Sequence, residues 1–154
     1  VSRPRTNPNR WRPTSNPRWV DRMLAGSATP HFEVEFSSFR DGLRAYVTGH
    51  NGSLECTLGY WRAIAAEVRL KRPGKLLVVD VMDGGVPPPE HLLDFVQQMG
   101  EEDIHDLRIA YVEDKPESIP KVELAGIFAH EQGFRVQVFA SEDAAMTWLR
   151  YGDT

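Results

Sequence analysis

The chain has 154 residues, of which 41% are apolar and 26% are charged, and its formal net charge is −4. This length allows one domain with a real core but not two, and the composition is that of an ordinary globular protein. The single cysteine, Cys56, excludes an internal disulfide and a cysteine-rich zinc site. So few cysteines fit a reducing compartment, and we expect a cytoplasmic protein.

Long apolar runs are missing from the sequence. None approaches the ~20 residues that a membrane helix needs, so we expect no membrane span. No apolar segment follows the early arginines, and we therefore expect no secretory signal.

Positive charge is concentrated at the start of the chain. Residues 1–30 carry six arginines and one acid, a net charge of +5, which leaves −9 for residues 31–154. Five prolines and the lack of a hydrophobic period predict a flexible arm. Because Trp11 and Trp19 are costly to leave in water, we expect the arm to contact the acidic body or a neighbouring subunit. Attraction to nucleic acid or to a membrane surface ranks second, because the body is acidic, and a solubilising role ranks third.

The sequence after the arm begins with a predicted hairpin and a long helix. His31–Phe36 and Leu43–Gly49 both alternate apolar and polar residues, and the turn signal Arg40-Asp41-Gly42 separates them. This pattern predicts two antiparallel strands, each with one buried side. Apolar residues at helical spacing then predict a helix over residues 54–71, with Ser53 as its N-cap.

The segment Leu76–Met82 is the centre of the predicted fold. Six of its seven residues are apolar, and Asp80 is the exception. A strand that is apolar on both sides is typical of an inner strand in a parallel sheet. A segment rich in glycine and proline follows at residues 83–89, and a helix is predicted from Pro89 to Met99.

Two more strands and two more helices are predicted beyond this point. The strands are Leu107–Glu113 and the alternating Phe134–Ala140, an edge strand; the helices are 120–132 and a closing helix capped by Ser141. The order ββαβαβαβα predicts an α/β fold with a mostly parallel five-stranded sheet, one antiparallel strand and right-handed crossovers.

This order of elements resembles the STAS family, the sulfate-transporter and anti-sigma-factor-antagonist domain. The pattern that carries the resemblance runs from "LRIAYVE" through "GFRVQVFASEDAA" to "TWL", and the likeness extends over residues 31–151. The chain is most similar to small stand-alone bacterial STAS-like proteins, whose fold is also similar to lipid-binding CRAL-TRIO domains. The resemblance implies a STAS-like domain over residues 31–154 and a role in binding or regulation rather than catalysis.

The loop after the central strand is the site that the resemblance implies. In phosphorylated members of the family, a serine begins the helix that follows this strand. Residues 83–89 contain no serine or threonine, so this phosphorylation switch does not carry over. A partner-docking role could survive in the loop, whose candidate residues are Asp83, Gly84, Gly85, Val86 and Pro87. As an anion site the loop is weak, since its prolines remove N–H donors and Asp83 repels phosphate.

A second candidate site is acidic. Asp80 and Asp83, with Glu113 and Asp114 one strand away, are predicted at the carboxyl edge of the sheet. Such a cluster could bind a divalent cation or do acid–base work. The preferred interpretation is a solvated strand end at which Asp80 caps a neighbouring loop, because carboxylates in unusual settings mark functional sites only some of the time. The five histidines lack metal-ligand spacing, and we expect no metal and no cofactor.

The central strands carry more apolar residues than one layer of helices can cover. We expect Leu77, Val79, Val81, Ile109 and Tyr111 on the face away from the helices. The arm, a second subunit or an apolar ligand must cover them, and we predict a homodimer.

Three functions follow, in order of preference. The first is a non-enzymatic regulatory or protein-binding domain. The second is a carrier of a small apolar or lipid-like ligand, which requires an enclosed pocket of roughly several hundred Å³. The third is a hydrolase-type enzyme that uses Asp80, Asp83 and Glu113.

Overall fold

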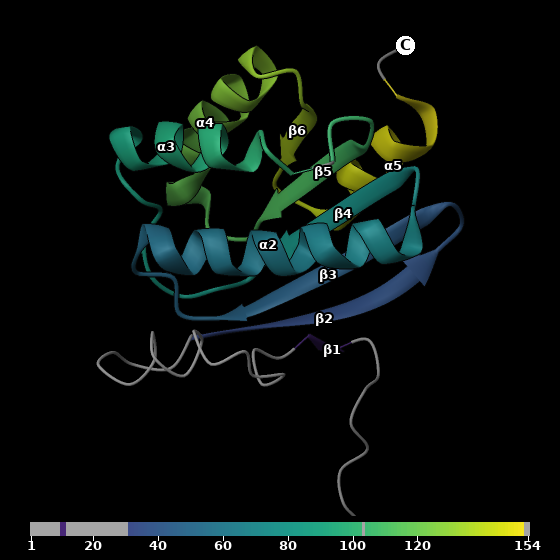
Figure 1. Ribbon diagram of the computed structural model, residues 1–154, viewed down its shortest axis with the longest axis horizontal. Coiled ribbons are helices and arrows are strands. Elements are labelled where there is room, and N and C mark those ends of the chain that lie inside the picture. The colour runs from purple at the N-terminus through teal and green to yellow at the C-terminus, as the bar shows by residue number, and fades with distance from the viewer. Residues whose placement is uncertain (1–9, 12–30, 103, 153–154) are drawn as a thin grey trace, which may run out of the picture.

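The computed structural model of the chain describes residues 10–11, 31–102 and 104–152. These residues form a six-stranded sheet whose strands lie in chain order (Figure 1). The strands are β1 (Arg10–Trp11), β2 (Phe32–Phe39), β3 (Gly42–Gly49), β4 (Lys75–Asp80), β5 (Arg108–Glu113) and β6 (Arg135–Phe139). The helices are α2 (Leu54–Lys71), α3 (Pro89–Met99), α4 (Ile119–Glu131) and α5 (Glu142–Tyr151), and a 3-10 turn spans Pro116–Ser118.

The predicted α/β order is confirmed, and local capping explains much of it. Ser53 and Ser141 accept hydrogen bonds from the backbone amides of Cys56 and Ala144, which begins α2 and α5 where predicted. β2 and β3 form the expected antiparallel hairpin, and β3 through β6 are parallel. β4 lies between β3 and β5, so its predicted central position is also confirmed.

The sheet has a helical layer on each face. Each crossover between neighbouring parallel strands places its helix on the same side, as right-handed connections require. α2, α3 and α4 therefore lie on one face, and α5 packs on the other face against β4, β5 and β6 (Figure 1).

β1 adds a sixth, very short strand to the five that were predicted. Its backbone pairs antiparallel with the edge of β2, Arg10 opposite Glu35 and Trp11 opposite Val34. At these two residues the predicted arm contacts its own domain. The rest of the arm, Trp19 included, lies outside the described residues.

The register between β4 and β5 corrects one prediction. Leu76 pairs with Ile109 and Leu77 with Ala110, so Ile109 shares the face of Leu76. Ile109 and Tyr111 thus belong to the large core under α2, α3 and α4, and not to the opposite face as predicted. A register between strands depends on tertiary packing, and the alternation within one strand does not contain it.

The opposite face has its own core, which α5 closes. This second core consists of Leu77, Val79, Ala110, Val112, Ala145 and Leu149. Near β3 the same face is polar: the Arg44 guanidinium lies over the Tyr46 ring and bonds both carboxylate oxygens of Glu142 at 2.6 and 3.2 Å. The surplus apolar face from which we predicted a homodimer is therefore largely covered within the chain.

Candidate functional site

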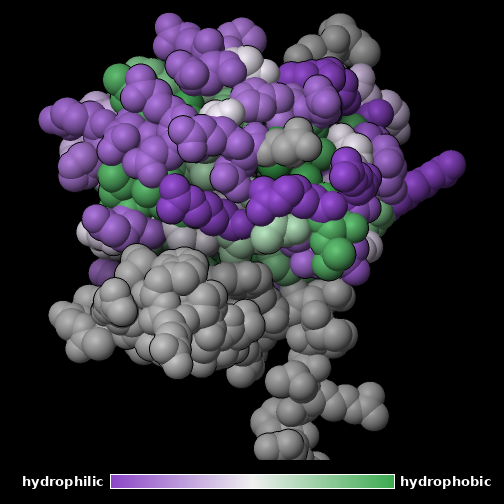
Figure 2. Space-filling model, viewed as in Figure 1, coloured by the Kyte–Doolittle hydropathy of each residue, from purple (hydrophilic) through white to green (hydrophobic). Residues whose placement is uncertain are grey.

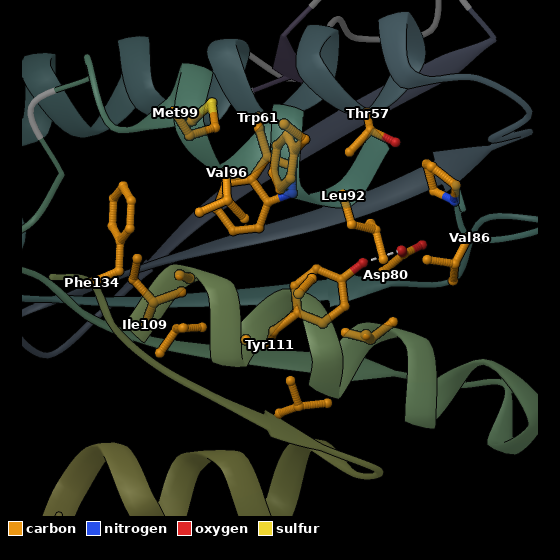
Figure 3. A pocket seen from close by; sticks show the side chains of 18 of the residues that line it. Thr57, Trp61, Asp80, Val86, Leu92, Val96, Met99, Ile109, Tyr111 and Phe134 are labelled. Atoms are coloured by element: carbon orange, nitrogen blue, oxygen red, sulfur yellow. Dashed lines mark hydrogen bonds between the residues drawn. The ribbon is translucent and has the colours of Figure 1, made fainter. Parts of the chain in front are cut away.

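A cavity of about 100 Å³ lies between the helices and the sheet, beneath α3 and α4 (Figure 3). Protein interiors are close-packed and rarely keep voids larger than a water molecule, so a space of this size is unusual. Its lining is mostly apolar and comes from α2, α3 and α4, from the strands β4, β5 and β6, and from neighbouring loops. The lining residues are Asn51, Thr57, Tyr60, Trp61, Asp80, Val86, Pro87, Leu92, Phe95, Val96, Met99, Ile104, Ile109, Tyr111, Val122, Ala125, Gly126, Ala129, Phe134, Val136 and Val138.

α3 supplies one wall of the cavity through a regular stripe. Leu92, Phe95, Val96 and Met99 are spaced three, four and seven residues apart, so they share one side of the helix, and all four are buried. Pro89 begins the helix at a position where its missing N–H leaves no hydrogen bond unmade. The loop that precedes α3 adds Val86 and Pro87 to the same wall.

α4 supplies the opposite wall and is the reason for the empty space. Ala125, Gly126 and Ala129 face the cavity, and none of them has a side chain long enough to fill it. Val122 is the buried residue of this helix. A β-carbon on Gly126 would meet only the side chain of Val138, at 3.7 Å, so alanine would fit here.

One end of the cavity is polar. The Tyr111 hydroxyl donates to one carboxylate oxygen of Asp80, and the backbone amide of Met82 donates to the other at 2.9 Å. The hydroxyl oxygens of Tyr60 and Tyr111 lie 3.3 Å apart. Figure 3 shows the Tyr111 hydroxyl and the Asp80 carboxylate pointing toward each other, away from the apolar end at Phe134.

Glu113 and Lys115 lie beside this polar end. Glu113 pairs with Asp80 across the two strands, and it is only 4% exposed. Its carboxylate accepts a hydrogen bond of 3.1 Å from the backbone amide of Lys115. The Lys115 amino group donates to the backbone oxygen of Met82 and lies 3.3 Å from Asp114. Lys115 thus links the ends of β4 and β5.

Burial changes the acid–base properties of these groups. It raises the pKa of Asp80, which the Tyr111 and Met82 hydrogen bonds partly oppose. Burial raises the pKa of Glu113 to about 7, with a further contribution from the charge of Asp80. Burial also raises the pKa values of Tyr60 and Tyr111 well above 10.0, so both remain hydrogen-bond donors at neutral pH.

The four predicted acidic residues do not form one cluster. Asp80 and Glu113 are buried side by side, whereas Asp83 and Asp114 are exposed. Asp80 caps the following loop through Met82, as the preferred interpretation had it, but in a buried and not a solvated setting. Among the described residues, no three histidine, cysteine, aspartate or glutamate side chains are placed to hold a metal ion.

The loop residues that were predicted to dock a partner divide into two groups. Asp83, Gly84 and Gly85 are exposed, whereas Val86 and Pro87 turn inward and line the cavity. The backbone of Asp83 is held against β3 by hydrogen bonds of 2.8 Å to Gly49 and Asn51. This support fixes the loop at the carboxyl edge of the sheet.

Sequence reasoning missed the partners of Asp80. It marked Asp80 as the one acid in an apolar strand, but it did not connect Tyr60, Tyr111 or Lys115 with it. Tyr111 and Glu113 are two residues apart in β5, so they share a face, and that was the available signal. Cys56 is half-buried, and burial raises the pKa of its thiol to about 11, so the thiol is uncharged at neutral pH.

A search of solved structures found an anti-sigma factor antagonist from Mycobacterium paratuberculosis that superposes with a TM-score of 0.52. The match covers 80% of this chain and 98% of that protein. The fold is that of an anti-sigma factor antagonist. The STAS-like fold predicted from the sequence is thereby confirmed, and at 17% identity the likeness establishes the fold alone. No family model and no curated protein matches the sequence.

Two further observations concern the helices and the surface of the described chain. Among the described helices, none combines the length and the apolar character needed to cross a bilayer. In the view of Figure 2, the described surface is mostly hydrophilic. Large exposed apolar residues are few and widely spaced along the described chain: Leu70, Leu93, Ile127 and Tyr151.

Proposed function

We propose that this chain is a non-enzymatic regulatory module that binds a protein partner at the carboxyl edge of its sheet. The docking surface would consist of the exposed residues Asp83, Gly84, Gly85, Pro88 and Glu90. The observation that carries the proposal is the anti-sigma factor antagonist fold together with this exposed, backbone-anchored loop.

The chemistry of the docking surface favours a basic partner. Asp83, Glu90 and Asp94 are exposed carboxylates on the loop and the first turns of α3, and Leu93 is 38% exposed beside them. A surface of one sign steers a partner of the opposite sign and sets its orientation. The lack of serine and threonine over residues 83–89 means that phosphorylation at this loop does not control the binding.

The two adjacent glycines offer a clean probe of this surface. Gly84 has φ of +90°, and a β-carbon there would lie 2.1 Å from the backbone oxygen of Asn51. A side chain at this position would strain the backbone and disturb the fold. At Gly85 a β-carbon meets nothing within 4 Å. A large side chain at Gly85 therefore projects into solvent from the docking surface and leaves the domain intact.

The proposal is tested with Gly85→Trp, and Ala144→Trp is its matched control. Ala144 is exposed on α5, on the other face of the sheet. Proteins captured from cells with the wild-type chain are identified, purified and titrated against the three chains. We expect Ala144→Trp to bind like wild type and Gly85→Trp to bind at least ~10-fold more weakly. Equal binding by Gly85→Trp would contradict the docking surface, and failure of any protein to bind the purified chain would contradict the function.

The other predicted functions receive different degrees of support. A lipid carrier would need a larger space than the cavity of about 100 Å³. The enzyme hypothesis would need convergent carboxylates, and two of its three, Asp80 and Glu113, are buried and hydrogen-bonded.

The homodimer stays a prediction, although the apolar face from which it was predicted is largely covered within the chain. Sedimentation that shows only a 17.4 kDa species would contradict it. Cytoplasmic location also stays a prediction.

A further inference from the structure

We propose that the cavity beneath α3 and α4 binds a small, neutral, mostly apolar molecule about the size of one six-membered ring, which donates a hydrogen bond to Asp80. The proposal concerns the cavity and does not depend on the docking surface, since the purified chain alone can test it.

The size of the cavity limits the ligand. A dry cavity of about 150 Å³ accepts benzene, and one water molecule takes about 30 Å³ in the liquid. The space of about 100 Å³ lies between these two volumes, so it suits a compact ring or a short branched chain and not a fatty acyl chain. Met99 lines the wall, and its flexible side chain allows small adjustments to the shape of an occupant.

The apolar end favours a ligand over water. Trp61, Val96, Ile109 and Phe134 surround this end (Figure 3), and they offer few hydrogen-bond partners to a water molecule. A buried water needs two to four polar partners, which are found here only near the opposite end. An apolar ring at this end would gain the dispersion contacts that the empty space forfeits.

The polar end determines which functional group the ligand carries. Asp80 is 6% exposed and accepts two hydrogen bonds, from Tyr111 and from the Met82 amide. A carboxylate has about four acceptor positions, so it keeps capacity for one more donor. A hydroxyl group at the polar end of an apolar ligand could donate this bond.

Charge excludes other ligand classes. Asp80 is a buried carboxylate that accepts two hydrogen bonds, and a carboxylic acid ligand would bring a second acidic group beside it. A cationic ligand would have to leave water for a mostly apolar cavity, and the Lys115 amino group already lies close to Asp80 at this edge. A neutral alcohol or phenol meets neither obstacle.

We expect a ligand to enter the cavity beside the loop after β4. Val86 lines the cavity and is half-buried, and the glycines before it are exposed, so the cavity lies close to solvent at the loop after β4. Small movements of this loop would admit a ring-sized molecule without unfolding a helix.

The experiment compares phenol, benzene and benzoate as probes of the purified chain. Binding is followed by calorimetry and by changes in the NMR signals of side-chain methyl groups. We expect saturable binding of phenol in the millimolar range or tighter, about fivefold or more tighter than benzene because of the hydrogen bond to Asp80. Benzoate should bind at least ~10-fold more weakly than phenol.

A cavity-filling variant locates the site. Ala129→Leu places a larger side chain in the cavity, and Ala66→Leu makes the same change on the exposed side of α2. Ala129→Leu should lose phenol binding by at least ~10-fold, and Ala66→Leu should bind like wild type. If Ala129→Leu does not fold by circular dichroism, the smaller change Ala125→Val replaces it, with the same expected direction.

Three results would overturn the proposal. The first is an absence of saturable phenol binding to the folded wild-type chain. The second is equal phenol binding by wild type and the folded cavity-filling variant, which would put the site elsewhere. The third is benzoate binding as tight as that of phenol, which would exclude a site selected by the Asp80 carboxylate.

Discussion

Under α5, the side chains of Leu77, Val79, Ala110 and Leu149 are between 0% and 4% exposed, and they fill the space between helix and sheet. On the other face of the same strands, α3 and α4 leave a cavity of about 100 Å³ with a buried carboxylate at one end.

The difference follows from how each helix meets the sheet. α5 places Ala145 against the strands, and this small residue lets Leu149 and its neighbours pack closely. α4 also presents small residues, Ala125 and Ala129, but the bulky residues of α3 do not fill the space that they leave. A complete core contributes to stability, whereas an incomplete one leaves room for a ligand at a cost in stability.

The largest expected effect compares the same substitution on the two faces. Leu149→Ala removes a fully buried side chain from the filled core, so it should lower the free energy of unfolding by about 3–5 kcal/mol. Leu92→Ala enlarges an existing cavity, where the side chain has fewer neighbours, and should cost about 2–3 kcal/mol. Urea denaturation measures both. An equal or larger loss at Leu92 would mean that the two faces are packed alike.

The second prediction concerns the hydrogen bonds at the polar end. Tyr111→Phe leaves one oxygen of the buried Asp80 carboxylate without its donor, which should cost about 1–3 kcal/mol. It should also raise the pKa of Asp80 further, because the lost hydrogen bond favoured the charged form. Tyr46→Phe, at a half-buried position on the other face, should change stability by no more than about 0.5 kcal/mol. Similar losses at both positions would show that Asp80 does not depend on Tyr111.

Much of the fold could be predicted because it depends on patterns of residues that are close together in the sequence. The alternation of β2, the N-caps Ser53 and Ser141 and the apolar stripe of α3 each depend on residues close in sequence. The central position of β4 could also be predicted, because a strand with apolar side chains on both faces has to be covered on both faces.

The cavity could not be predicted in the same way. Tyr111 meets Asp80 because β5 pairs with β4 in one register, and a shift of one residue would turn Tyr111 to the other face. The empty volume depends on how three helices sit over the sheet together, and no short segment encodes that. Asp80 was visible as a lone acid in an apolar strand, but its partners were not.

The third prediction uses pH to separate the polar end from the rest of the core. The pKa of Glu113 is raised from 4.5 to about 7 in the folded chain. Between these values the folded state binds more protons than the unfolded state, so stability falls as pH rises through this window. Glu113→Gln removes this contribution, and its stability relative to wild type should improve from pH 4 to pH 8 by on the order of 1–2 kcal/mol. Thermal unfolding across this range measures the change.

A control for the pH experiment lies close by. Glu117 is an exposed glutamate in the 3-10 turn after β5. Glu117→Gln should keep the pH dependence of the wild-type chain. If Glu113→Gln also keeps it, the raised pKa of Glu113 is refuted.

The smallest expected effect is a gain in stability at the loosely packed wall. Gly126→Ala adds one methyl group where its nearest neighbour is 3.7 Å away, in the interior of α4. Better helix propensity should raise the free energy of unfolding by about 0.5–1 kcal/mol. Guanidinium denaturation would show this, and a loss of stability would mean that α4 packs more tightly than described.

The most direct test of the account is an NMR titration of the wild-type chain with phenol, read at methyl groups on both faces of the sheet. We predict saturable shifts for Leu92, Val96 and Ile109, which line the cavity, and none for Val79 and Leu149 in the core under α5. Shifts on both faces alike, or on neither, would contradict the claim that one face is filled and the other holds a ligand site.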